Sequence, residues 1–152
     1  MAATAWQLYN SAKRYIGNGT ITLGAGVFKM LLAQTASNAS TFTLSTYASV
    51  TNEISATGGY ATGGKQLVPA AGFWTSGTSA KQMKFTMSTV GLAFTASGAS
   101  LTNIKYAILR NSTGAGAGKL LCFCQLSSSQ FTVTSPNTLT VLPAATGIFT
   151  LT

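Results

Sequence analysis

Short apolar segments with a period of two, separated by turn-forming residues, dominate this chain from Thr20 to its last residue. In such segments alternate side chains face opposite sides of the backbone, which is the pattern of a half-buried β-strand. The segments are rich in Val, Ile, Thr, Phe and Tyr, and clusters of Gly, Ser, Asn or Pro bound them. The predicted strands are Thr20–Leu23, Val27–Ala33, Gly64–Val68, Gln82–Met87, Gly91–Thr95, Ser100–Arg110, Lys119–Leu126, Phe131–Thr134, Thr138–Leu142 and Ile148–Thr152.

Many short strands at this spacing predict a mainly β protein with an antiparallel β-sandwich or jelly-roll-like fold. The pattern admits an immunoglobulin-like topology as well, and it does not choose between them. The length of 152 residues suits one domain with a sizeable core.

The first residues follow a different period, which predicts one N-terminal helix. An apolar stripe at helical spacing consists of Ala5, Leu8, Tyr9, Ala12, Tyr15 and Ile16. The helix should begin at Ala3 or Thr4 and end at Gly17, because glycine commonly terminates helices. We therefore expect an N-terminal helical segment over residues 1–19 and a single β-sandwich domain over residues 20–152.

Three stretches of small residues predict long surface loops, namely Ala36–Ser45, Ser55–Gly64 and Asn111–Gly118. Loops of this size usually carry function or make contacts. The glycines before Lys119 invite comparison with a phosphate-binding loop, Gly-x-x-x-x-Gly-Lys-Ser/Thr followed by a helix. Thr113 stands at the first position of that motif and Leu120 at the last, so we interpret the stretch as a hairpin loop.

The supply of catalytic side chains excludes most enzyme mechanisms. The chain has nine Lys or Arg, one acidic residue (Glu53) and no His, which gives a net charge of +8. General acid–base catalysis usually needs His, Asp or Glu within reach of a substrate. These residues cannot form a catalytic triad, a Cys–His pair, a two-carboxylate glycosidase site or a His or carboxylate metal site. We expect a protein that is not an enzyme and has no catalytic residue, metal or cofactor.

The cysteines and the apolar stretches bear on the redox state of the chain and on whether it enters a membrane. Cys122 and Cys124 lie two residues apart in a predicted strand, so both face the same side, and we expect buried free thiols. Reduced thiols suit a protein made in a cytoplasm. The longest apolar stretches, such as Val27–Ala33 (broken by Lys29) and Leu120–Cys124, are far shorter than the ~18–20 residues of a membrane span. We expect neither a membrane span nor a secretory signal.

The low charge and its sign indicate a binding role. Only 7% of the residues are charged, and an uncharged surface loses its hydration at little cost, which suits burial against other subunits. The other interpretation is an uncharged but soluble domain. The candidate partner contacts are Trp6, Lys13, Arg14, Lys65, Lys81, Lys84, Lys105, Arg110 and Lys119. These cations form no nucleic-acid-binding motif, so docking on an acidic protein is favoured and a nucleic-acid-binding module is the alternative.

Two single residues carry further hypotheses. Trp6 falls off the helical stripe, so it either forms an exposed docking element or folds back onto the domain. Glu53, the one acidic residue among nine cations, can anchor its loop by accepting backbone N–H bonds or by pairing with a Lys or Arg. The alternative for Glu53 is an exposed carboxylate without measurable effect.

Three stretches together resemble a family of small β-rich virion structural proteins encoded by tailed bacteriophages. The stretches are Tyr47–Glu53 with Gly58–Lys65, then Leu92–Gly98 with Leu101–Thr102 and Tyr106–Asn111, and lastly Leu139–Val141 with Ala145–Leu151. An N-terminal helix that ends near Gly17 also suits that family. The resemblance implies a non-enzymatic particle component and carries over no catalytic residue.

Taken with the charge, the resemblance predicts a capsid decoration (cement) protein. Such a protein would pack across subunits of the major capsid protein, as a homo-oligomer and by preference a trimer. It would be assembled in the host cytoplasm and found in the virion. The nearest alternative is a neck, tail or fibre component of the same virion.

Overall fold

The computed structural model describes residues 3–69, 72–77, 79 and 81–152. Strands account for 36% of the chain and helices for 10%, and the described sheets are antiparallel. The predicted fold class, mainly β and sandwich-like with one helix near the N-terminus, is confirmed.

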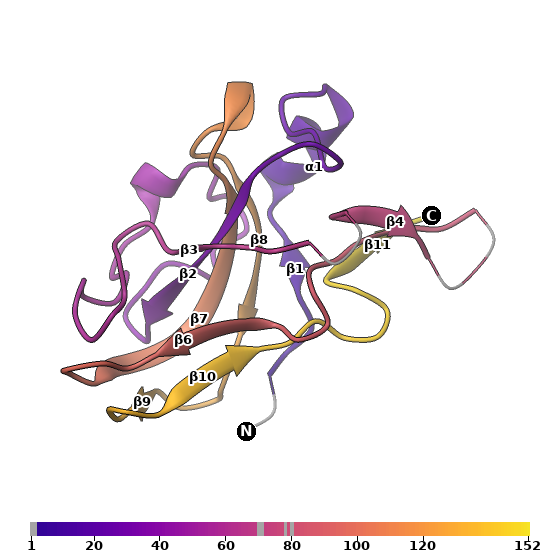
Figure 1. Cartoon of the computed structure of the whole chain (residues 1–152). Coiled ribbons are helices and arrows are strands. Elements are labelled where there is room, and N and C mark those ends of the chain that lie inside the picture. Colours follow the sequence, from indigo (N-terminus) through magenta and orange to yellow (C-terminus); the bar gives the residue numbers. More distant parts are fainter. Residues whose placement is uncertain (1–2, 70–71, 78, 80) are drawn as a thin grey trace.

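One large sheet forms the centre of the described part of the chain (Figure 1). It has six strands, of which five follow the order β1-β8-β7-β2-β3, and β9 pairs with β7 off this path. Its strands are β1 (Gln7–Leu8), β2 (Phe28–Gln34), β3 (Lys65–Gln66), β7 (Leu101–Asn111), β8 (Leu120–Gln125) and β9 (Phe131–Val133). Residues 112–119 connect β7 to β8 as a hairpin and include a short 3₁₀ helix, η2 (Gly114–Gly116).

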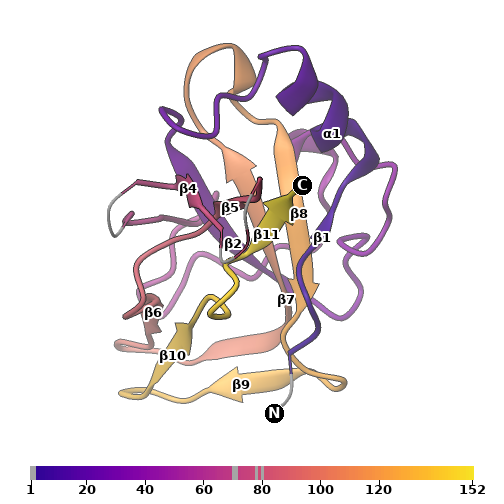
Figure 2. The same ribbon diagram turned by 90° about the vertical axis from the view of Figure 1, so that its right-hand side faces the viewer.

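Two smaller sheets lie on one side of the large sheet, as Figures 1 and 2 show. The first pairs β6 (Leu92–Thr95) with β10 (Thr138–Val141), and the second has the order β11-β5-β4. The strands of the second are β4 (Trp74–Ser76), β5 (Met83–Phe85) and β11 (Phe149–Leu151). The ring of Phe28 on β2 lies 4.9 Å from that of Phe85 and 5.2 Å from that of Phe73, so aromatic packing joins the layers.

The opposite face of the large sheet is covered by the segment 35–64, which has little regular structure apart from η1 (Tyr47–Ser49) (Figure 1). Side chains on β2 alternate between the two faces, yet both Met30 and Leu31 are fully buried. Burial on both faces explains why residues 30–33 of this strand form a continuous apolar run rather than an alternating one.

The helix is shorter than the sequence predicts, and the prediction is wrong for residues 3–9. Helix α1 spans Asn10–Gly17, whereas the residues before it are extended and form β1 on the edge of β8. Tyr9 is fully buried, and its hydroxyl donates a 2.7 Å hydrogen bond to the carbonyl oxygen of Ala39. The backbone of these residues bonds to the edge of β8 instead, where the Thr4 N–H donates to the Gln125 carbonyl and the Tyr9 N–H to the Leu121 carbonyl, so the apolar stripe alone misplaces the start. Residues 1 and 2 of the predicted segment lie outside the described residues.

The other strand predictions hold in position with shifted ends, with one exception. Thr20–Leu23 is not a strand, because the chain turns back on the helix there: the Ile21 N–H donates to the Tyr15 carbonyl at 2.9 Å. Strands β1 and β4 had no counterpart among the predictions. The described part of the chain contains no helix long and apolar enough to cross a membrane.

Candidate functional site

The carboxylate of Glu53 lies at the centre of a hydrogen-bond network in the segment 35–64. Its Oε2 accepts a 2.6 Å bond from the Tyr47 hydroxyl. Its Oε1 accepts a 2.5 Å bond from the Tyr60 hydroxyl and a 2.7 Å bond from the Gly63 N–H. Three donors from two separate parts of this segment therefore converge on one side chain.

The backbone of this segment places Glu53 beside the large sheet. Glu53 pairs with Ala33 in an isolated β-bridge next to β2. On either side of the bridge the Gln34 N–H donates to the Asn52 carbonyl at 2.9 Å, and the Ile54 N–H donates to the Leu32 carbonyl at 3.0 Å. The carboxylate is thus held against β2, and the tyrosines that bind it are held there as well.

Tyr60 and Arg110 connect the network to the sheet. The Tyr60 hydroxyl donates to Glu53 and accepts the Leu32 N–H at 3.1 Å. The Arg110 guanidinium donates to the Gly63 carbonyl from Nε at 3.2 Å and from Nη2 at 3.0 Å, and it lies 4.4 Å from the centroid of the Tyr47 ring. Arg110 therefore acts inside the fold through cation–π and hydrogen-bond contacts.

Both tyrosine hydroxyls are held in the protonated form. Burial, followed by the hydrogen bond to the Glu53 carboxylate and its negative charge, raises the pKa of Tyr47 to about 12. Burial and the hydrogen bond to Glu53 also raise the pKa of Tyr60. A phenolate beside the carboxylate would lose its donated hydrogen bond and meet a like charge, which is why the neutral form is favoured.

The raised pKa of Tyr47 predicts a loss of stability in alkali. The folded protein keeps this proton up to a pH of about 12, while the unfolded chain releases it near 10.0. The unfolded state then binds fewer protons in that window, so the free energy of unfolding falls as the pH rises. Urea unfolding measured across this window should show that decline, and Tyr47→Phe should make it shallower. An identical slope for Tyr47→Phe and the wild type would contradict this account.

The predicted contact residues differ in how available they are. The exposed ones are Lys13, Arg14, Lys65 and Lys81, and the partly buried ones are Trp6, Glu53, Lys84, Lys105, Arg110 and Lys119. The Nζ atom of Lys65 donates a 2.8 Å bond to the Ala93 carbonyl, and that of Lys105 lies 5.7 Å from the centroid of the Tyr106 ring. The structure therefore spreads the cations over several elements and engages some of them internally.

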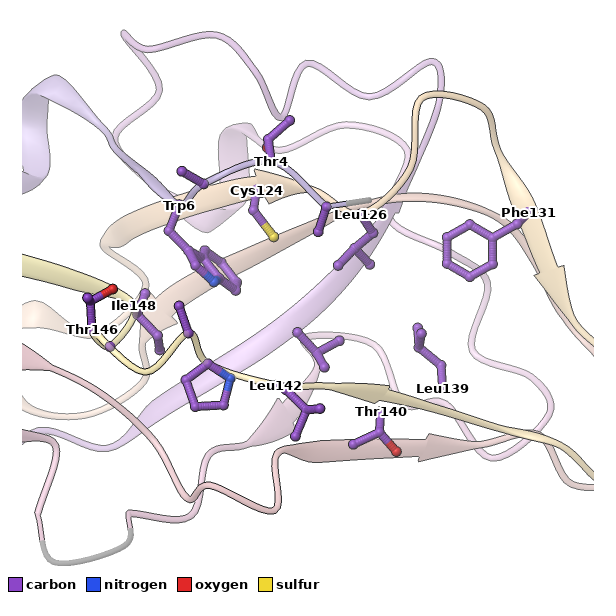
Figure 3. Close-up of a pocket in the computed structure, with 16 residues that line it drawn as sticks. Thr4, Trp6, Cys124, Leu126, Phe131, Leu139, Thr140, Leu142, Thr146 and Ile148 are labelled. Atoms are coloured by element: carbon purple, nitrogen blue, oxygen red, sulfur yellow. The ribbon is translucent and has the colours of Figure 1, made fainter. Parts of the chain in front are cut away.

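Trp6 is half-buried and packs against the core, so its ring is not a freely exposed docking element. It lines a groove of about 560 Å³ between the N-terminal strand and the segment after β10 (Figure 3). The other labelled lining residues, among them Cys124, Leu139 and Ile148, are mostly apolar, and none of the lining residues is charged. The role of Trp6 as a partner contact remains a prediction.

Cys122 and Cys124 are free and buried on the large sheet. Burial raises the pKa of both thiols, that of Cys124 to about 12. The thiolate is the reactive form of cysteine, so both side chains behave as small apolar residues in the fold.

The network around Glu53 could not be listed from sequence reasoning, although the sequence contains a signal for it. Tyr47 and Tyr60 flank the one acidic residue at comparable distances along the chain, and two glycines follow shortly after.

In comparisons with known proteins, no family model, no curated protein and no solved structure matches this chain.

Proposed function

We propose that this chain is a non-enzymatic structural protein of a tailed-phage particle, and most specifically a capsid decoration (cement) protein. The observation that carries the proposal is the charge balance. Nine cations stand against one carboxylate, and both oxygens of that carboxylate are bound by Tyr47, Tyr60 and Gly63 within the fold. The surplus positive charge is available to an acidic partner surface.

The segment 35–64 supports the same proposal. It is long, uncharged except for Glu53, and fixed to the sheet by the backbone bonds beside β2 together with the Glu53 network. A neutral surface loses its hydration at little free-energy cost when it is buried against another subunit. A surface already held in one conformation also loses little conformational entropy on binding. In the proposed role, trimers of this chain pack across neighbouring subunits of the major capsid protein and stabilise the assembled shell by binding to it.

Particles assembled without this chain should lose resistance to heat. Binding that favours the assembled shell over its separated subunits raises the temperature at which the shell opens. Genome release on heating, measured by dye access to the packaged DNA, should therefore occur at a lower temperature in these particles, and added purified chain should restore the wild-type value. Equal release temperatures with and without the chain would overturn the cement role.

Copy number separates the cement role from the neighbouring alternative. Quantitative mass spectrometry of purified particles should give this chain in numbers comparable with the major capsid protein. A few copies per particle would instead identify a neck, tail or fibre component.

A further inference from the structure

Two cations converge on one tyrosine at the end of α1. The Arg14 guanidinium lies 5.3 Å from the centroid of the Tyr15 ring, and the Lys119 Nζ atom lies 5.2 Å from the same centroid. The Tyr15 side chain is only 8% exposed, whereas Arg14 is exposed and Lys119 is partly exposed. Both positive charges therefore lie within cation–π distance of one aromatic ring.

Backbone contacts fix the position of Lys119 relative to the helix. Thr46 pairs with Lys119 in an isolated bridge, and the Leu120 N–H donates to the Ser45 carbonyl at 3.0 Å. The same segment runs beside α1, where the Ser11 hydroxyl donates to the Leu44 carbonyl at 2.9 Å. The two cations thus belong to elements that are tied to each other and not to independent mobile loops.

The positive charge at Tyr15 has no acidic side chain to neutralise it. The sequence contains one acidic residue, Glu53, and its carboxylate is engaged by Tyr47, Tyr60 and Gly63. Burial alone would raise the pKa of Tyr15, but the Arg14 side chain, the charge of Lys119 and the Ser45 hydroxyl together lower it. The surroundings of this hydroxyl therefore favour negative charge.

An exposed aromatic residue, Phe42, is bonded through its backbone to the first residue of α1. Phe42 is 44% exposed, and its ring packs edge-on against that of Phe123 at 5.4 Å. The Phe42 carbonyl accepts the N–H of Asn10 at 3.0 Å, and Asn10 and Arg14 lie four residues apart on one face of α1. We call the surface formed by Phe42, Lys13, Arg14 and Lys119 the α1 face; Figure 2 shows the helix at the edge of the molecule, beside the β7–β8 hairpin loop.

We propose that the α1 face binds a carboxylate-rich patch on a partner protein, with Phe42 as its apolar anchor and Arg14 and Lys119 as its charge contacts. An aromatic anchor beside arginine is a common composition of energetically dominant interface residues. The inference rests on the proposed function in one respect, namely that the partner is a neighbouring protein of the virion.

The surface fits an acidic protein better than a nucleic acid. Binding of single strands depends on aromatic rings whose faces are open to the bases. On the α1 face the ring of Tyr15 is buried beneath its cations, and Phe42 is the single exposed ring, packed edge-on against Phe123, so the face has no series of open rings for successive bases. A carboxylate needs only the two positive charges, which the α1 face supplies.

Poly-L-glutamate and a short DNA duplex are suitable probes for the α1 face. Arg14→Gln combined with Lys119→Gln should weaken poly-L-glutamate binding about tenfold at low salt, because it removes both charge contacts. The matched control is Lys81→Gln with Lys84→Gln, which changes the net charge equally on and beside β5 and should weaken binding less than about threefold. Thermal unfolding of each variant verifies that it is folded.

Two outcomes of this experiment would overturn the proposal. Equal losses in the two double variants would show that binding follows net charge and not the α1 face. Tighter binding of the duplex than of poly-L-glutamate, abolished by the Arg14 and Lys119 substitutions, would assign the surface to nucleic acid.

Rebinding to particles that lack the chain separates this inference from the proposed function. Phe42→Ser and the Arg14 and Lys119 double variant should each rebind at least about tenfold more weakly than the wild type. Wild-type rebinding with no loss in either variant would overturn the α1 face and leave the proposed function standing. A wild-type chain that does not rebind would overturn the proposed function, while the poly-L-glutamate result would still decide whether the α1 face binds acidic chains.

Discussion

Glu53→Ala should lower the free energy of unfolding by about 3 kcal/mol or more, because it leaves the Tyr60 hydroxyl and the Gly63 N–H without their acceptor. It also removes the acceptor of Tyr47. Hydrogen bonds to a charged group contribute about 1.5–3 kcal/mol each, and several of them depend on this one side chain. Urea unfolding followed by circular dichroism measures the loss.

One further variant separates the charge of Glu53 from its shape, and a second serves as a control. Glu53→Gln keeps one oxygen acceptor but replaces the other by an amide N–H, so one tyrosine must reverse its hydrogen bond. We expect a loss of about 1–2 kcal/mol for this change. Ser55→Ala is the matched control on an exposed neighbour, and it should change stability by less than about 0.5 kcal/mol.

The network also predicts which part of the chain is destabilised first in Glu53→Ala. The segment 35–64 should become accessible to protease before the large sheet unfolds, because Glu53 fixes this segment while β2, β7 and β8 pair with one another independently of it. Glu53→Ala with wild-type stability and unchanged cleavage of the segment would show that the carboxylate is structurally dispensable.

The periodicity of the sequence predicts the strands best where two long strands follow each other in the chain and pair as a hairpin. Residues 101–111 and 120–125 form the longest hairpin of the sheet, and both were predicted from alternation and branched or aromatic composition with boundaries within about two residues. Local pattern suffices there, because a hairpin pairs segments that are close in sequence. The strand composition and the fold class follow from the same signal.

Local pattern fails where a distant segment decides the conformation. The first residues carry a helical stripe, but the edge of β8, more than a hundred residues away, pairs with Gln7 and Leu8 and holds them extended. The partners of Glu53 were missed for a related reason. Tyr47 and Tyr60 lie near Glu53 along the chain, but they meet the carboxylate where β2 holds Glu53 in a bridge with Ala33, and their spacing alone does not establish that contact.

The cations show the limit of predicting a partner-binding surface from the sequence alone. Sequence analysis proposed eight of them as equivalent contacts, whereas the structure gives Arg110 and Lys65 internal acceptors and brings Arg14 and Lys119 together at Tyr15. Which cations remain for a partner depends on the tertiary fold, because an acceptor such as the Gly63 carbonyl lies 47 residues from Arg110.

Gly64→Ala should destabilise the protein by about 4 kcal/mol or more, since it combines backbone strain with a steric overlap. Gly64 has a φ of +81°, which L-residues other than glycine rarely adopt. A Cβ atom here would overlap the carbonyl oxygen of Met30, and it would lie 2.6 Å from the Met30 carbonyl carbon and 2.8 Å from the Leu31 Cα. Backbone atoms inside a paired strand cannot move aside as a flexible side chain can.

Gly98→Ala supplies the control that separates the overlap from the strain. Gly98 also has a positive φ, +73°, but a Cβ atom there would meet nothing within 4 Å, so we expect a cost of only about 1–2 kcal/mol. The difference in the free energy of unfolding between the two variants measures the cost of forcing β3 away from β2. Because Gly64 directly precedes β3 and follows the Gly63 N–H that binds Glu53, the overlap should also release the Glu53 network. Equal losses for Gly64→Ala and Gly98→Ala would show that β3 can shift away from Met30 without a measurable cost to β2 or to the Glu53 network.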